Sequence, residues 1–343
     1  YKEYKSLFDF FTWRLIKEAP KLHLFENLDR YVKRFFKNPR LHRILEYNTV
    51  FLGSDPAGTP ALYSLMSHVD FNLGVWYPVG GMGKVVKGFE SVARDLGVTL
   101  RYEAAAVKIV TRGGKAVSVL TAAGEIPADR VISTADYHHT ETKLLDPSDR
   151  SYPERYWEKR TMAPSALLAY LGVSGRVSGV EHHTLYLDMG WERHFDDIFR
   201  RPAWPERPSY YVCAPSKTDR SVAPDGKENL FLLVPLASGL DDTDERRERL
   251  FDETMAHLEG LTGDSIRSRL EVKRLFSHRD FTSTFNAYKG TALGIAHTLF
   301  QTAVFRPRHR SKKVSNLYFA GNYTHPGIGV PMAIISAHIV ASE

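Results

Sequence analysis

The 343-residue sequence has little cysteine and no long apolar run, and each absence narrows the class of protein. Cys213 is the only cysteine, which excludes an internal disulfide framework and favours a reducing compartment. No run approaches the roughly 20 apolar residues needed to cross a bilayer, and no signal-peptide pattern opens the chain. We therefore expect a soluble or membrane-peripheral protein with one large core or two joined cores.

A net charge is also missing from most of the chain. The net charge of +6 comes from the first 43 residues, which hold eleven Lys and Arg against five Asp and Glu, and the rest of the chain is neutral. A basic excess confined to one segment does not indicate a polyanion-binding surface. Nucleic acid is therefore not an expected partner.

The basic first segment is also aromatic, and its apolar spacing predicts amphipathic helices on either side of Pro20. The apolar positions are Phe8, Phe11, Leu15, Leu28, Tyr31, Val32, Phe35 and Phe36. Aromatic anchors with a basic rim suit an anionic membrane surface. A helix that packs on the core and turns a solvated face outward explains the pattern equally well.

Residues 82–133 read as a helix followed by short strands. Apolar residues recur at helical spacing over 82–96, and Gly97 stands where a left-handed residue would end the helix. Strands are expected at 98–102 and 107–109, then a hairpin turn at 112–115 leads into 116–120, and a further strand covers 130–133.

From about Ser151 the chain predicts a largely antiparallel sheet with longer strands. The expected strands are 167–173, 183–187, 210–214 and 230–236. The charged run 241–249 then leads into apolar residues at helical spacing, which predicts the solvated start of a helix that covers the sheet.

The end of the chain predicts a strand, a turn and a helix. An apolar strand at 317–320 stops at Gly321-Asn322, and residues 327–333 open a helix with Pro331 where a missing N–H is harmless. Such a turn presents free backbone N–H groups and the positive end of a helix dipole. It would suit an electron-rich ligand, although glycines that only make a tight turn would look the same.

Several segments in the right order carry a family resemblance. They are residues 74–82, 131–136, 288–294, 301, 306–307, 316–318 and 324–331. Together they resemble bacterial-type phytoene desaturases, FAD-dependent carotenoid desaturases of the amine-oxidase-like flavoprotein superfamily, over nearly the whole chain.

This resemblance implies a mixed α/β (α+β) fold in which a Rossmann-like FAD-binding domain is interleaved with an antiparallel-sheet substrate domain and a helical membrane-facing segment. The implied division is 1–73 for the helical, membrane-docking segment, 74–150 for the middle of the FAD-binding domain, 151–310 for the substrate-binding domain and 311–343 for the C-terminal part of the FAD-binding domain.

The resemblance also implies cofactor contacts. The backbone at Val107 would approach the adenine, whereas Gly321, Asn322 and the start of the last helix, Gly329, Val330, Pro331 and Met332, would approach the ribityl chain and the isoalloxazine. Amine oxidases commonly have an acid at the position of Asn322. An amide can still form a hydrogen bond with a ribityl hydroxyl group.

One feature of such flavoproteins is missing from the sequence, because no G-x-G-x-x-G motif occurs in it. The nearest glycine cluster, residues 80–84, has neither the dinucleotide spacing nor the P-loop pattern. We therefore expect the chain to be a fragment without the N-terminal βαβ unit, inactive by itself and poor at binding FAD.

Metal and side-chain catalysis are not indicated by the pattern. His138-His139 and His182-His183 are adjacent pairs that cannot both face one ion from a regular strand, and no Cys, Asp or Glu stands at ligand spacing around them. No metal site is expected and no catalytic residue is assigned. His325, in the expected flavin-facing turn, is expected to pack beside the cofactor.

The activity that the resemblance implies is carotenoid desaturation. A hydride would pass from one carbon of a phytoene-like polyene to the flavin and a proton would leave its neighbour, so that no strong base is obligatory. A membrane surface, and quinone or oxygen as electron acceptor, are expected partners, at the cytoplasmic face of the membrane. A carotenoid isomerase or ketolase, an amine or porphyrinogen oxidase, and a noncatalytic membrane- or lipid-binding module remain alternatives.

Overall fold

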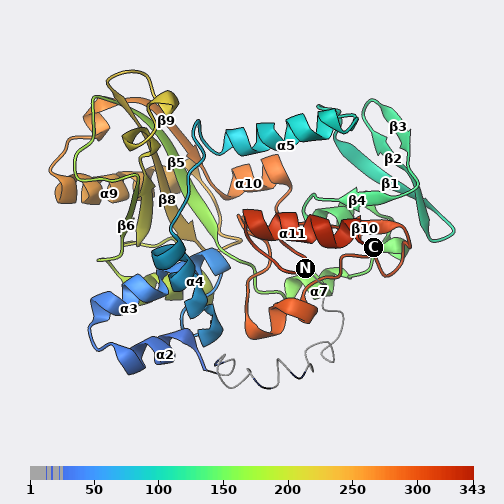
Figure 1. Ribbon diagram of the computed structural model, residues 1–343, viewed down its shortest axis with the longest axis horizontal. Coiled ribbons are helices and arrows are strands. Elements are labelled where there is room, and N and C mark those ends of the chain that lie inside the picture. Colours follow the sequence, from blue (N-terminus) through green and yellow to red (C-terminus); the bar gives the residue numbers. More distant parts are fainter. Residues whose placement is uncertain (1–12, 14–16, 18–22, 24–25) are drawn as a thin grey trace. The chain divides into compact units, whose positions relative to one another are not determined.

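The computed structural model describes residues 13, 17, 23 and 26–343 (Figure 1). The expected helix that contains Phe8, Phe11 and Leu15 lies outside these residues. The chain forms two compact units, each built from separate stretches of sequence. Unit 1 comprises Tyr1–His68, Tyr102–Pro164 and Thr282–Glu343, and unit 2 comprises Val69–Arg101 and Ser165–Phe281. The expected mixture of helices with antiparallel sheets is confirmed.

The α-helices of the described residues are α2 (Leu28–Phe35), α3 (Pro39–Glu46), α4 (Leu65–His68), α5 (Gly83–Asp95), α6 (Tyr137–His139), α7 (Glu154–Glu158), α8 (Trp191–Phe195), α9 (Asp244–Thr262), α10 (His278–Phe285) and α11 (Val330–Ala341). The strands are β1 (Ala106–Arg112), β2 (Lys115–Thr121), β3 (Gly124–Pro127), β4 (Val131–Ser133), β5 (Ser165–Ser174), β6 (His183–Tyr186), β7 (Tyr210–Cys213), β8 (Lys227–Leu236), β9 (Leu270–Phe276) and β10 (Leu317–Phe319). Among the described residues, no helix is both long enough and apolar enough to cross a bilayer.

Unit 2 is organised by a five-stranded antiparallel sheet of order β6-β7-β8-β5-β9, with α9 beside it (Figure 1). Successive strand residues alternate between two faces, and one face forms a core with α9. The expected strands at 167–173, 183–187, 210–214 and 230–236 are confirmed as β5 to β8. The sequence did not predict β9, because its middle is charged and exposed.

Helix α9 begins and ends where its sequence dictates. Thr243 caps it by accepting a hydrogen bond from the Arg246 N–H, and Asp244 and Glu245 place negative charge in the first turn. Gly263 ends it with φ of 68°, a left-handed conformation that glycine adopts without strain. The expected covering helix is therefore confirmed.

Unit 1 contains two small sheets. β4 and β10 form a parallel pair with Val131 opposite Leu317, and β1, β2 and β3 form an antiparallel sheet. The hairpin turn expected at 112–115 is confirmed, with Gly113 and Gly114 both at positive φ. The strand expected at 98–102 was wrong, because these residues follow the end of α5 as an exposed, irregular segment despite their alternation.

Helix α5 confirms the helix expected at 82–96, with Gly97 left-handed (φ 78°) just after it. Likewise α2 confirms the helix expected from Leu28 onward, and Asn27 caps it by accepting a hydrogen bond from the Arg30 N–H.

Candidate functional site

The closing strand and helix are tied together by a hydroxyl group. β10 is fully buried, and Phe319 stacks on Tyr137 with ring centroids 3.7 Å apart. Immediately after it, the Gly321 N–H donates to Ser336 Oγ of α11 at 2.9 Å. Thr324 Oγ1 donates to the Gly321 carbonyl and lies 2.9 Å from Ser336 Oγ. The turn after β10 is thereby held against the second turn of α11.

Arg306 holds the same turn from inside the unit. Its side chain is buried and donates to five backbone carbonyls, which belong to Ile295, Gln301, Asn322, Tyr323 and Thr324. Burial lowers the pKa of Arg306 to about 10, so the guanidinium stays charged at neutral pH. A buried charge is tolerated here because carbonyl dipoles surround it.

His297 supports the second half of the turn. Its Nε2 accepts a hydrogen bond from the Ile328 N–H at 3.2 Å, and burial, with Arg306 and His325 nearby, lowers its pKa to about 3. The neutral ring therefore serves as a fixed acceptor. Gly327 has φ of 124°, and a Cβ there would lie 2.2 Å from His297 Nε2, so only glycine fits.

Asp136 links the end of β4 to the turn. One carboxylate oxygen accepts the His139 N–H and caps α6. The other accepts the Tyr323 hydroxyl group at 2.5 Å and the Tyr288 N–H at 3.1 Å. Burial and then Asp136 raise the pKa of Tyr323 well above its ordinary value, so the phenol remains a donor.

The surface in front of this turn is open. Gly321 and Gly329 both have φ of 121°, and a Cβ on Gly321 would meet no atom within 4 Å. No side chain of the described residues caps α11, and Pro331 stands in its first turn. The side chains of Val330 and Ile334 are 52% and 48% exposed. This strand end and helix start thus present backbone N–H groups and apolar surface to a ligand.

The residues that the resemblance assigned to the cofactor fall into two places. Gly321 and Asn322 lie half-buried after β10, while Gly329, Val330 and Pro331 are exposed and Met332 half-exposed at the start of α11. Val107, 50% exposed, lies at the start of β1, which belongs to a different sheet. The structure therefore brings the closing residues together, and the cofactor contacts of all seven remain predictions.

Sequence reasoning did not identify the residues that hold the turn. Arg306 and Asp136 entered only as parts of matching segments, and Ser336 and His297 carried no role. The one available signal was that Arg306 has no acid near it in the sequence and stands directly before Pro307. Its partners could not be predicted, because every residue has a backbone carbonyl and such acceptors leave no sequence signature.

A cavity of about 480 Å³ lies elsewhere on unit 1, toward the C-terminal end of α11. Its lining is basic and includes Arg308, Arg310 and Lys312, together with Ser342 and Glu343. Arg306 and His325 also line this cavity, so it reaches the turn after β10, but its lining does not include the residues that begin α11.

The histidine pairs differ from their expected surroundings. His138 Nε2 lies 2.9 Å from Glu154, an ordinary ion-pair geometry. His182, however, precedes β6, so the two histidines do not occupy successive positions of a regular strand and need not point to opposite faces. The pairing of β6 with β7 sets His183 opposite Cys213. Spacing along the sequence therefore did not reveal that a ligand atom of Cys213 lies within 4.8 Å of this pair.

Comparison with known proteins places the chain among flavoenzymes. The family model of flavin-containing amine oxidoreductases matches residues 15–343. The carotenoid 3,4-desaturase of Haloarcula japonica is 47% identical over 343 residues, which cover 99% of this chain and 69% of the relative. The zeta-carotene-forming phytoene desaturase of Myxococcus xanthus is 34% identical, over 100% of this chain and 66% of the relative. The chain thus spans about two thirds of these curated relatives.

Among solved structures, an oxidoreductase from Methanosarcina mazei aligns with a TM-score of 0.61 at 15% identity, over 98% of this chain and 75% of that one. At this level of identity the match concerns the fold alone.

Proposed function

Because this chain belongs to the flavin-containing amine oxidoreductases and, within that family, to the carotenoid desaturases, which are oxidoreductases acting on CH–CH groups, we propose that the complete protein uses FAD to introduce double bonds into a phytoene-like polyene. Its family indicates a flavin, and FAD is the form that we propose. Quinone or oxygen is the proposed final acceptor.

The open turn between β10 and α11 is the observation that carries this proposal. Its residues fit a flavin, because among the described residues no atom lies within 4 Å of a Cβ built on Gly321 and no side chain caps the first turn of α11. A bound flavin would supply a two-electron acceptor. Backbone N–H groups at the start of α11 and the amide of Asn322 would hold its polar edge, and Val330 and Met332 would contact its apolar parts.

At this turn, the side chains of this chain would contribute to the chemistry by holding the backbone in place. Arg306, Ser336 and His297 fix the backbone that would orient the ring, so that little reorganisation is needed when a substrate arrives. The pKa values of His297 and His325 are lowered by burial to about 3 and about 4, so both rings are neutral at physiological pH. No fixed positive charge from these two histidines would therefore oppose oxidation of a hydrocarbon.

The proposed substrate surface is the face of the unit 2 sheet opposite α9. Strand register places Tyr170 opposite Phe231, Phe231 opposite Cys213, and Leu233 opposite Tyr211. The Tyr170 and Phe231 rings lie 5.3 Å apart, and the Phe231 and Tyr211 rings 6.4 Å apart. A row of aromatic and aliphatic side chains across the strands, with Tyr170 44% exposed, suits a flat, apolar polyene.

The helical segment α2–α3 is the proposed membrane contact, in a cytoplasmic protein bound to the membrane surface. Phe35 is 64% exposed and Ile44 44% exposed, and Lys37, Arg40 and Arg43 lie between them in sequence. Exposed apolar side chains beside cations bind anionic lipid headgroups and acyl boundaries. Sedimentation with vesicles of acidic and neutral lipids tests this: binding should need acidic lipid and weaken with salt.

Product analysis tests the proposed activity. The complete protein, supplied with FAD, a quinone and phytoene, should yield products with additional conjugated double bonds and two hydrogens fewer for each step. A product with the same number of double bonds would instead identify an isomerase on this scaffold, and a product with added oxygen would identify a ketolase. If no carotenoid is changed but an amine is oxidised, the desaturase proposal is wrong.

A further inference from the structure

A cluster of three metal-binding side chains lies on unit 2, at the edge of the sheet that ends with β6. One ligand atom from each of His182, His183 and Cys213 lies within 4.8 Å of the other two. His183 and Cys213 face each other across antiparallel strands, a geometry that places both side chains on the same face. The rings of His182 and His183 are 4.3 Å apart and only 33° from parallel.

Each histidine has one ring nitrogen engaged and the other directed away from that partner. His182 Nδ1 is 2.6 Å from Thr218 Oγ1, and His183 Nδ1 is 2.6 Å from the Tyr211 hydroxyl oxygen. Nε2 of His182 is buried and has no hydrogen-bond partner among the described residues. Metal-binding histidines typically donate one N–H to such an oxygen and coordinate through the other nitrogen.

The hydroxyl groups of Thr218 and Tyr211 can both accept a hydrogen bond from the histidine ring beside them. Thr218 Oγ1 lies 3.5 Å from the Pro215 carbonyl and donates to it, which leaves its lone pairs to His182. The Tyr211 hydroxyl oxygen likewise has lone pairs that can accept the hydrogen bond from His183.

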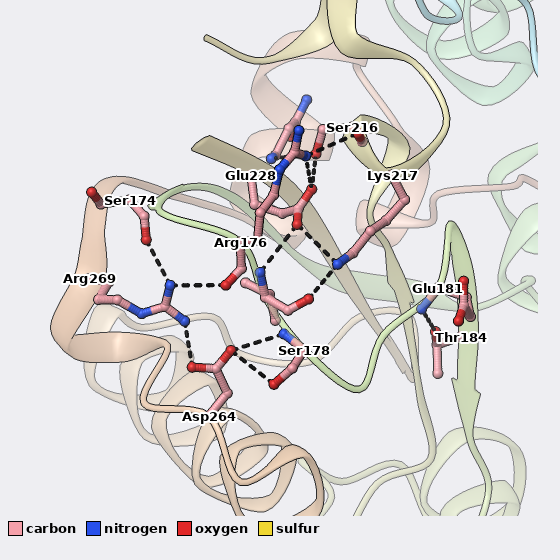
Figure 2. Close-up of polar contacts among 12 residues, drawn as sticks. Ser174, Arg176, Ser178, Glu181, Thr184, Ser216, Lys217, Glu228, Asp264 and Arg269 are labelled. Atoms are coloured by element: carbon pink, nitrogen blue, oxygen red, sulfur yellow. Dashed lines mark hydrogen bonds and ion pairs between the residues drawn. The ribbon is translucent and has the colours of Figure 1, made fainter. Parts of the chain in front are cut away.

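The loops that carry the cluster are anchored by a buried carboxylate (Figure 2). Glu228 accepts the Val177 N–H at 3.2 Å and Arg176 Nη1 at 3.0 Å, on the loop that leads to His182. It also accepts the Ser216 hydroxyl group and pairs with Lys217 at 3.1 Å, on the loop that leads to Thr218. Glu228 therefore links the loop that leads to His182 with the loop that leads to Thr218.

We propose that His182, His183 and Cys213 bind a divalent metal ion of the zinc class, with a fourth position for water or another ligand. Two imidazole nitrogens and a thiolate are donors that such an ion prefers over the hard cations Mg²⁺ and Ca²⁺. Tetrahedral zinc needs its ligand atoms roughly 3.5 Å apart, so the side chains close by about 1 Å on binding. Binding releases the Cys213 thiol proton to solvent.

Bound metal would join the edge strand β6 to β7 and to the loop before it. β6 is only four residues long and pairs on one side with β7. A metal bridge between His183 and Cys213 would reinforce this short pairing, next to the aromatic row proposed for the polyene. All three side chains belong to unit 2, so the metal would bind whether or not the complete protein is a desaturase.

Cobalt binding tests the site, because Co²⁺ adopts zinc geometry and reports thiolate coordination by an absorption band. The complete protein without a histidine tag, stripped by a chelator, should bind one equivalent of Co²⁺ with a thiolate-to-metal band that Zn²⁺ abolishes. Cys213→Ser should remove the band, and His182→Gln or His183→Gln should weaken Co²⁺ binding more than tenfold. Thr218→Val should weaken it about 10- to 100-fold, because the oxygen that orients His182 is lost.

His138→Gln, in the other histidine pair, is the matched control and should bind Co²⁺ as the unmodified protein does. Alkylation of Cys213 in the unmodified protein, followed on its peptide by mass spectrometry, avoids any folding defect of a variant. Zn²⁺ should slow this alkylation at least tenfold. Equal alkylation rates with and without Zn²⁺, or a cobalt band that persists in Cys213→Ser, would overturn the proposal and leave a hydrogen-bonded cluster only.

Discussion

Helices α9 and α5 are both amphipathic, yet one is covered and the other is not. In α9, six residues are buried, including Phe251, Met255 and Leu258 in the core of the unit 2 sheet. In α5 no residue is buried, and Val86 and Phe89 are 68% and 56% exposed. Apolar periodicity thus predicted both helices, and the position of α9 over the sheet, but it gave no sign that the apolar face of α5 would be exposed.

The same contrast separates closed and open parts of unit 1. The inner side of the turn after β10 is closed, because the buried guanidinium group of Arg306 donates to the carbonyls of Asn322, Tyr323 and Thr324. The start of α11 is open, because Val330 is exposed and none of the side chains that the structure describes caps the helix. A substitution in a closed region should lower the stability of the fold. A substitution in an open region should leave stability nearly unchanged and affect ligand binding instead.

Arg306→Leu should have the largest effect on the closed side of this comparison. Five carbonyls around a buried position would lose their donor, and we expect the free energy of unfolding to fall by about 5 kcal/mol, with loss of flavin binding. Denaturant unfolding measures the first effect and flavin titration the second. Arg155→Leu on the exposed face of α7 is the control, and it should change stability by less than about 0.5 kcal/mol. Equal stability of the two variants would contradict the role of Arg306.

The comparison between the two helices is tested by one substitution made in each. Phe251→Ala should lower the free energy of unfolding by about 3–5 kcal/mol, because it leaves a cavity against the sheet. Phe89→Ala should cost less than about 1 kcal/mol in this chain, because its ring is already exposed. A large loss for Phe89→Ala, measured by the same denaturant titration, would show that the apolar face of α5 is covered in solution.

Lowering the pH should reduce the stability of unit 2, because the buried carboxylate of Glu228 becomes protonated. Burial alone would raise the pKa of its side chain, but hydrogen bonds from Ser216 and Val177 and the pairing with Lys217 outweigh burial and hold the pKa below 4.5. The folded state therefore favours the charged form, and this stabilisation is present above pH 4.5 and is lost as the pH falls through the folded pKa.

Glu228→Gln should thus cost about 2 kcal/mol at pH 7 and progressively less at lower pH. Urea unfolding at a series of pH values measures the difference. Glu271→Gln, at an exposed pair with Lys227, is the control and should cost less than about 1 kcal/mol. A cost that stays constant down to the lowest pH would exclude the charged form as the source of stability.

The smallest effects should have opposite signs at two glycines. Gly327→Ala forces a side chain into positive φ and against His297, and it should destabilise the chain by about 2 kcal/mol. Gly88→Ala, in the middle of α5 with no atom within 4 Å of the new Cβ, should stabilise it by about 0.5–1 kcal/mol. Thermal unfolding of both variants decides the sign, and a destabilised Gly88→Ala would imply that α5 is not helical in solution.

Local rules predicted much of this fold. The glycine after α5, the hairpin at Gly113-Gly114 and the four strands β5 to β8 follow from dihedral preference and period-two alternation. Alternation failed at residues 98–102, where no strand forms, and missed β9, whose exposed charged side chains conceal its pairing with β5. Strand formation depends on a partner, which the local sequence does not contain.

The candidate sites divide in the same way. The strand, turn and helix at the chain's end could be predicted from Gly321, Gly329 and Pro331, because glycine and proline impose local geometry. The contacts of Arg306 join residues up to 18 positions away, and Cys213 approaches His183 only because β6 pairs with β7. Such groupings come from tertiary structure, and spacing along the chain gave no sign of them.

Anaerobic reaction of the complete, FAD-loaded protein with phytoene tests the central claim most directly. The flavin absorbance should bleach once per double bond formed, and a variant that fills the open turn, Gly321→Val, should lose both flavin binding and bleaching. New double bonds without bleaching, or flavin binding unchanged in Gly321→Val, would contradict the assignment of a flavin to the turn between β10 and α11.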